Sequence, residues 1–214
     1  MSLRSDAIAT WRASRLFLAG LLLAANAMAN PATDPESDRF PPVQIEDRVV
    51  LYPITGRNAA ELRAQLENHG PMAAEPGHGR TRSEFEVIST LEPIDRACHL
   101  GAATVSLRTI TTLPQWVDRR GASADTVNRW VESLALLERH EAGHRGHAVD
   151  AARALREALR ALAPQRDCRT LQWTVDRELQ RVVWKLEMRG NRYDSRTGNG
   201  SRDDPLRDAR LLPD

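Results

Sequence analysis

The chain has 214 residues, which suits one domain of ordinary size or at most two small ones. Hydrophobic residues make up 41% of it and charged residues 28%, as in globular proteins, so the composition excludes wholesale disorder. The formal net charge of +1 argues against nucleic acid as the main partner, because the arginines are scattered and matched by acids.

The first 29 residues have the pattern of a secretory signal peptide. Arg4, Arg12 and Arg15 precede an apolar run over residues 16–25, and Ala27-Met28-Ala29 has the small-x-small pattern of a cleavage site. A membrane anchor is the alternative, but the run is about half the roughly 20 residues that span a bilayer. We therefore expect an exported protein, periplasmic or secreted, with no stable membrane anchor once residues 1–29 are removed.

Residues 30–42 are rich in Pro, Asp and Ser, and they are expected to form a flexible lead-in to a single domain over residues 43–200. A strand is expected from Val43 onward, because apolar residues alternate there. Asn58 then has the features of a helix N-cap, and Glu61 completes a capping box three residues later. The pair Gly70-Pro71 is expected to end this short helix.

Two further strands are predicted by period-two alternation. Their alternating residues are Phe85, Val87, Ser89 and Leu91, and then Ala103, Val105, Leu107 and Thr109. The stretch Leu113-Pro114-Gln115-Trp116 is expected to break the sheet pattern.

The chain contains two cysteines, Cys98 and Cys168. In an oxidising compartment an isolated pair forms a disulfide by default, and we expect this bridge here. It would close a loop of about 70 residues. By lowering the conformational entropy of the unfolded chain, it would stabilise the fold by on the order of 4 kcal/mol. A role as metal ligands is the weaker alternative, because the two residues lie far apart in the sequence without a CxxC partner.

Two helices are predicted in the second half of the chain. The first extends from about Asp125 to Leu162 and has an apolar stripe with steps of three and four residues. Members of the stripe are Val127, Val131, Leu134, Leu137, Ala148, Ala152, Leu155, Leu159 and Leu162. The second extends from about Thr170 to Met188, and residues 201–214 are expected to be a disordered tail. Strands first and helices last indicate an α+β fold, in which a small antiparallel sheet packs against both helices.

The motif His140-Glu141-Ala142-Gly143-His144 fills a gap in the apolar stripe of the first helix. His140 and His144 are one helical turn apart, so both imidazoles can bind one Zn²⁺ ion, and Glu141 can then take a proton from a zinc-bound water. Gly143 lets another backbone or a substrate come close to the helix, although it lowers helix propensity by up to about 1 kcal/mol. The alternative is a surface helix that matches a short motif by chance.

The third zinc ligand has several candidates. His147 returns to the same helix face about 10 Å further along the axis, which favours a peripheral or solvent position. Three acids of the second helix are candidates too, although acids on a charged helix are usually solvated: Asp176, Glu178 and Glu187. Beyond that helix, Asp194 could bind the ion, and the phenol of Tyr193 could stabilise an oxyanion.

Several motifs, in this order, resemble the DUF922 family of predicted secreted zinc-dependent proteases. They are Tyr52-Pro53-Ile54-Thr55-Gly56, Ala60-Glu61-Leu62-Arg63, Gly70-Pro71, Leu113-Pro114-x-Trp116, Trp130, HExGH at 140–144 and Tyr193-Asp194-x-x-Thr197-x-Asn199-Gly200. The resemblance implies an exported peptidase acting on peptides or proteins, with His140 and His144 as zinc ligands and Glu141 as the catalytic acid-base. Asn199 departs from the family pattern, which has a histidine there. A neutral amide is a poor zinc ligand, and this leaves Asp194 as the favoured third donor.

The sequence is compatible with three interpretations. The first is an active exported metallopeptidase or amidohydrolase. The second is a degenerate relative that binds zinc weakly or not at all and serves as an envelope binding module, with Asn199 as its main support. The third is a structural domain in which His140 and His144 form hydrogen bonds within the core.

Overall fold

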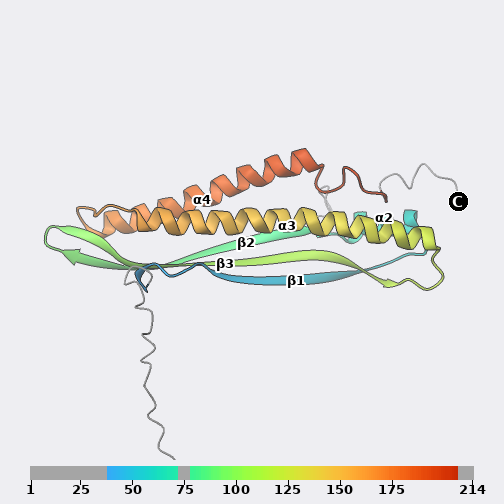
Figure 1. Ribbon diagram of the computed structural model, residues 1–214, viewed down its shortest axis with the longest axis horizontal. Helices are drawn as coiled ribbons and strands as arrows, with labels where there is room; N and C mark the ends of the chain where they lie inside the picture. Colours follow the sequence, from blue (N-terminus) through green and yellow to red (C-terminus); the bar gives the residue numbers. More distant parts are fainter. Residues whose placement is uncertain (1–37, 72–77, 207–214) are drawn as a thin grey trace, which may run out of the picture. The chain divides into compact units, whose positions relative to one another are not determined.

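The computed structural model describes residues 38–71 and 78–206 of the chain. The elements within these ranges are β1 (Gln44–Thr55), α2 (Ala59–His69), β2 (Arg80–Ile94), β3 (Ala97–Asp118), α3 (Ala124–Arg160) and α4 (Cys168–Thr197). The strands form one sheet, and α3 and α4 cover one of its faces (Figure 1). The α+β fold with one long helix and one C-terminal helix is thereby confirmed. The predicted signal peptide, residues 1–29, lies outside the described residues.

The sheet has the strand order β1-β3-β2, with β2 antiparallel and β1 parallel to β3. The prediction of an antiparallel sheet is therefore wrong for one of the two pairings. Strands β2 and β3 form a hairpin, whose turn includes Asp95 in the left-handed region at φ 54°. Because the chain reverses direction between β1 and β2 and again between β2 and β3, β1 runs parallel to β3 along its free edge.

Strand β3 continues through Leu113-Pro114-Gln115-Trp116, where a break was predicted. The pairing of β3 with β2 reaches only Thr112, whereas its pairing with β1 goes on, with Tyr52 opposite Pro114. Pro114 thus lies where β3 has a neighbour on one side only. An edge position tolerates the missing N–H of proline, so the strand extends to Asp118.

The main hydrophobic core lies between the sheet and the two long helices. Alternate residues of β3 face the helices and are buried, as the period-two pattern predicted. The buried members of this core are Phe40, Cys98, Leu100, Ala103, Val105, Leu107, Ala148, Val149, Ala152, Leu155, Leu159, Leu171, Val175 and Val182. The predicted stripe on α3 needs one correction, because Val131 is 52% exposed and Trp130 beside it is buried.

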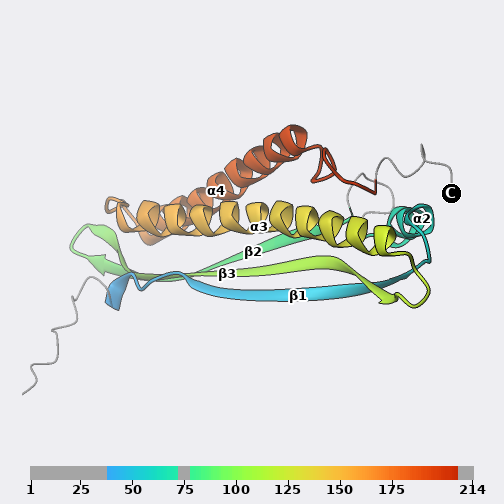
Figure 2. The same cartoon turned by 45° about the vertical axis from the view of Figure 1, so that its right-hand side comes forward.

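A second, smaller core joins α2 to the ends of β1 and β3 and the start of α3 (Figure 2). Its buried members are Ile54, Leu62, Leu66, Trp116, Trp130 and Leu206. The rings of Trp116 and Trp130 meet edge to face, with centroids 5.9 Å apart, and this contact explains why Trp130 takes the buried position on α3. Leu206 was predicted to belong to a disordered tail, but it is buried in this core. The folded domain therefore extends at least to this residue.

The predicted flexible lead-in is also wrong for the part that is described. Phe40 is buried in the main core. The side chain of Arg156 on α3 donates hydrogen bonds to the carbonyl oxygens of Phe40 and Pro41, and Arg39 donates to the carbonyl of Leu100. Residues 38–41 are thus fixed to the domain, while residues 30–37 lie outside the described residues.

Helix α2 begins as predicted, because the side chain of Asn58 accepts a hydrogen bond from the N–H of Glu61 at 2.9 Å. Glu61 in turn accepts from the N–H of Arg57, one residue before the N-cap. Helix α4 is longer than predicted and continues past Met188 to Thr197, where Gly198 ends it in the left-handed region. Tyr193 therefore lies on the helix rather than beyond it.

The predicted disulfide between Cys98 and Cys168 is confirmed, with a Cα–Cα distance of 5.0 Å. The backbone of Cys98 also exchanges two hydrogen bonds with Gln165. Together these contacts fix the start of β3 to the start of α4. Among the described helices, none has a stretch of sufficient length and hydrophobicity to cross a membrane.

Candidate metal centre

Three potential ligand atoms converge between the middle of α3 and the end of α4. His140 Nε2 lies 3.1 Å from His144 Nε2, and Asp194 Oδ1 lies 2.8 Å from His144 Nε2 and 3.1 Å from His140 Nε2. Within residues 38–71 and 78–206 this is the one group of three His, Cys, Asp or Glu side chains with such geometry. We define these three residues as the donor cluster.

The other candidate acids lie outside the donor cluster. Asp176 accepts a hydrogen bond from Gln172, Glu178 pairs with Arg181, and Glu187 is exposed. His147 is also outside the cluster, as the helix rise predicted, and its ring lies edge-on to Tyr193 with centroids 5.1 Å apart. Of the candidates for a third ligand, the fold thus brings Asp194 alone to the two motif histidines.

A hydroxyl group fixes the orientation of the His140 ring. Thr197 Oγ1 donates its hydrogen to the carbonyl of Tyr193 at 2.8 Å, and the same oxygen lies 3.2 Å from His140 Nδ1. Since that hydrogen is already used, Nδ1 carries the proton and donates it to Thr197, which leaves a lone pair on Nε2. Burial and the neighbouring His144 lower the pKa of His140, so the ring is neutral at neutral pH.

The donor cluster suits a divalent cation. A neutral His140 turns the lone pair of Nε2 toward both Asp194 and His144, an arrangement that is repulsive unless a cation or proton lies between the atoms. In a tetrahedral zinc site with bonds of about 2.0–2.1 Å, neighbouring ligand atoms are roughly 3.3 Å apart. The observed separations therefore fit zinc after shifts of a few tenths of an ångström.

The side chain of Glu141 contacts the start of β2. Its Oε2 accepts a hydrogen bond from Thr81 Oγ1 at 2.7 Å, and the carboxyl group packs against Gly79, where an added Cβ would lie 2.9 Å from Oε1. The side chain is 3% exposed. Burial raises the pKa of Glu141, and the hydrogen bond from Thr81 opposes part of that increase.

Tyr193 explains the glycine in the middle of the motif. Its ring stacks on His140 with centroids 4.9 Å apart and lies edge-on to His144 at 5.1 Å. Its hydroxyl lies over Gly143, where an added Cβ would come within 2.3 Å of the oxygen. The close approach predicted at Gly143 is thus made by a side chain of α4. Burial raises the pKa of Tyr193, so the phenol keeps its proton.

The turn after α4 packs against the ring of His140. Asn199 has a φ of 55° in the left-handed region, and its N–H donates to the carbonyl of Asp194. Asparagine tolerates this conformation better than most residues do, so its place here has a conformational reason. The turn brings Gly200, at φ 75°, onto the ring of His140, where a Cβ would lie 2.8 Å from Cγ.

One contact of the motif helix has no signal in the sequence. Arg145, which follows His144, forms an ion pair with Asp47 on β1, and Arg145 Nε lies 2.9 Å from Asp47 Oδ1. Thr109 Oγ1 donates to the same carboxylate oxygen at 2.5 Å. The arginine and the hydroxyl lower the pKa of Asp47. These bonds join α3 to the edge strand β1.

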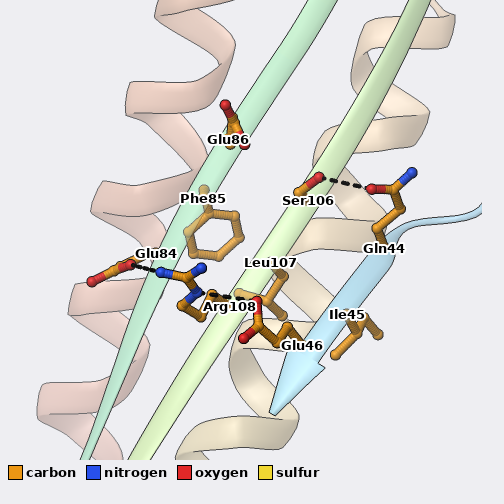
Figure 3. Close-up of a pocket in the computed structure, with 9 residues that line it drawn as sticks. All are labelled: Gln44, Ile45, Glu46, Glu84, Phe85, Glu86, Ser106, Leu107 and Arg108. Atoms are coloured by element: carbon orange, nitrogen blue, oxygen red, sulfur yellow. Dashed lines mark hydrogen bonds and ion pairs between the residues drawn. The ribbon is translucent and has the colours of Figure 1, made fainter. Parts of the chain in front are cut away.

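A groove on the sheet lies apart from the donor cluster (Figure 3). Arg108 lies across it between Glu46 and Glu84, with nitrogen–oxygen distances of 3.2 and 3.8 Å. Because the two carboxylates neutralise the guanidinium and all three side chains are largely exposed, the groove is a solvated surface of the sheet. None of the predicted site residues lines it.

Comparison with known proteins yields one family match. A model of the family described as bacterial protein of unknown function (DUF922) matches residues 49–200. The matched region begins within β1 and ends at Gly200, so it contains α2, α3, α4 and the whole donor cluster. No curated protein and no solved structure matches the chain.

Proposed function

We propose that this chain, which belongs to the DUF922 family, is an exported zinc-dependent metallopeptidase that hydrolyses peptide or protein substrates. The observation that carries the proposal is the convergence of two imidazole nitrogens and one carboxylate oxygen within 3.1 Å of one another. Two histidines and one carboxylate are the ligands of many catalytic zinc sites that keep a fourth position open. His140, His144 and Asp194 would hold the ion.

The residues around the donor cluster suit the hydrolysis of an amide. Zinc, when bound, polarises a carbonyl oxygen and lowers the pKa of a bound water. Glu141 would accept the proton of the attacking water and return it to the leaving amine, and burial raises its pKa, which makes it a stronger base. Tyr193, which keeps its proton, would donate a hydrogen bond to the oxyanion.

Export is supported by two separate features. The signal-peptide pattern over residues 1–29 lies outside the described residues, whereas the disulfide between Cys98 and Cys168 is part of the described fold. Structural disulfides persist mainly in oxidising compartments such as the periplasm and the extracellular space. A periplasmic or secreted location agrees with both features.

A second candidate function is an inactive relative that serves as an envelope binding module. The observation that favours it is the hydrogen bond from Thr81 to Glu141, because this bond holds the carboxylate against β2. A general base must reach the proton that it removes. In this alternative the donor cluster binds zinc weakly or not at all, and Glu141 has no catalytic role.

Metal analysis of the purified protein tests the site. We expect about one zinc per chain in the wild type and in His147→Ala, a matched histidine outside the donor cluster, and little zinc in His144→Ala or Asp194→Ala. Negligible zinc in the wild type would refute the proposal. Hydrolysis of a peptide library, read by mass spectrometry, then separates the two functions. The peptidase requires cleavage that Glu141→Gln abolishes while zinc stays bound, and the binding module requires no cleavage by either protein.

A further inference from the structure

Helix α4 exposes both of its tryptophans to solvent. Trp173 is 58% exposed and Trp184 57%, whereas Trp116 and Trp130 are almost fully buried. Met188 on the same helix is 38% exposed. Scattered exposed apolar residues are ordinary, but large exposed aromatic side chains that gather on one element indicate an interaction surface.

The exposed side chains lie along one line of the helix. Trp173 and Trp184 are 11 residues apart, which corresponds to about three turns, a spacing of roughly 16 Å along the axis and nearly the same direction. Met188 follows one turn later. The side of α4 that packs on the fold carries Leu171, Val175 and Val182, so the tryptophans take no part in the core. In Figures 1 and 2, α4 begins beside α3 over the sheet and rises away from the sheet toward its C-terminal end.

The same helix carries a net positive charge. Its 30 residues include seven Arg and Lys and four Asp and Glu, although the whole chain has a net charge of only +1. Two of these bases are in ion pairs, Arg181 with Glu178 and Arg189 with Asp150 of α3. The exposed acids Asp176 and Glu187 each follow one of the tryptophans by three residues. The guanidinium of Arg177 lies over the ring of Trp173 at 4.6 Å. Lys185 is exposed and directly follows Trp184 in the sequence, about 100° further round the helix.

We propose that this surface, which we call the Trp face (Trp173, Arg177, Trp184, Lys185 and Met188), binds reversibly to an anionic lipid bilayer. Indole rings favour the boundary between headgroups and acyl chains, and nearby Arg and Lys pair with anionic headgroups. Self-association through this face would bring two basic helices together, so the charge favours an anionic partner over a second copy. The contact is peripheral, because the exposed apolar residues Trp173, Trp184 and Met188 occupy only one narrow side of α4.

Binding through the Trp face would hold the donor cluster close to the membrane. Met188 precedes Asp194 by six residues, which is about 9 Å along the helix axis. The inference does not depend on the proposed peptidase, because it needs neither zinc nor hydrolysis. If both are correct, the substrates are peptides or proteins at the membrane surface.

Vesicle sedimentation tests the Trp face. The chain without residues 1–29 keeps every described residue and removes the apolar segment that could bind lipid by itself. We expect it to sediment with phosphatidylcholine vesicles that contain about one third phosphatidylglycerol, and to stay in solution with phosphatidylcholine alone. Trp173→Ala/Trp184→Ala should reduce binding at least tenfold. Lys185→Gln should reduce it about fivefold, the effect of one basic residue near an anionic surface.

Ile88→Ala is the matched control, because Ile88 is an exposed apolar residue on the sheet. It should bind like the wild type. The blue shift of tryptophan emission on adding anionic vesicles should disappear in Trp173→Phe/Trp184→Phe, which keeps the aromatic area. Equal binding by the wild type and the double alanine variant would overturn the proposal, and so would equal binding to neutral and anionic vesicles. Dimerisation in solution that the double alanine variant abolishes would assign the face to a second copy instead.

Discussion

Gly143 lies where the Tyr193 side chain of α4 packs onto α3, and replacing it with alanine tests this contact of the candidate metal centre. The added Cβ would come within 2.3 Å of the Tyr193 hydroxyl oxygen and 2.6 Å of Cζ. A flexible side chain could swing aside at little cost, but the ring of Tyr193 is held between His140, His144 and His147. The clash therefore has to be relieved by moving the end of α4.

The expected change in the free energy of unfolding follows from two opposing effects. Alanine in a helix interior is favoured over glycine by about 1 kcal/mol. Overpacking a filled site costs about 1–3 kcal/mol. Gly146 is the matched control, because it lies on the same helix and nothing lies within 4 Å of its added Cβ. Gly146→Ala should be stabilised by about 1 kcal/mol, and Gly143→Ala should be less stable than Gly146→Ala by about 1–3 kcal/mol.

Urea unfolding of the two variants, followed by far-UV circular dichroism, measures this difference. Zinc affinity should fall by about 10- to 100-fold in Gly143→Ala, since Asp194 directly follows the displaced Tyr193, and should not change in Gly146→Ala. Gly143→Ala/Tyr193→Ala should recover the helix-propensity gain relative to Tyr193→Ala. Equal stability and equal zinc affinity of the two glycine variants would refute the contact between Tyr193 and Gly143.

Thr197→Val removes the acceptor of the His140 Nδ1 proton, so zinc affinity measured by competition with a chromophoric chelator should fall about 10- to 100-fold. Thr197→Ser should restore it, and equal affinity of all three proteins would contradict this role. Cys98→Ser/Cys168→Ser should lower the free energy of unfolding by on the order of 4 kcal/mol, and an unchanged urea midpoint would be the contrary result. Leu206→Ala should cost about 2–5 kcal/mol in the same assay, whereas no effect would restore the prediction of a disordered tail. The lowered pKa of Asp47 stabilises the fold above the ordinary carboxyl pKa of 3.8, and this contribution is lost as the pH falls through the lowered value. The stability difference between wild type and Asp47→Asn should therefore shrink below that pH, and a difference that grows on acidification would oppose the ion pair with Arg145.

The local pattern predicted strands where one face of the sheet is buried and the other solvated. Val105 and Leu107 alternate with more exposed residues, so the period of two is visible in the sequence. The pairing partner is not visible, because a strand with one buried face has the same period in parallel and antiparallel ladders. The extension of β3 through Pro114 also depends on a tertiary feature, namely the point where β2 stops pairing.

The HExGH motif predicted two members of the donor cluster, because both histidines lie on one helix and their spacing is local. Asp194 was one of several candidates, and the helix that carries it extends nine residues past the predicted end at Met188. That extension has no apolar periodicity. Its residues are instead stabilised by polar and ring contacts to α3. Thr81 and Asp47 contact the motif helix across 60 and 98 positions of sequence, a distance that no local pattern spans.

Through its contacts, the last segment of the region that matches the family, residues 193–200, packs against the HExGH motif. Tyr193, Asp194 and Thr197 fall within about 100° of one another on the helix. In that order they contact Gly143, His144 and the Nδ1 side of His140. Gly200 then lies close to the His140 ring. The residues at the end of α4 and after it are therefore those that fit the motif on α3. A cation in the donor cluster would join the end of α4 to the middle of α3, so zinc should raise the stability of the wild type with increasing concentration and leave that of Asp194→Ala unchanged.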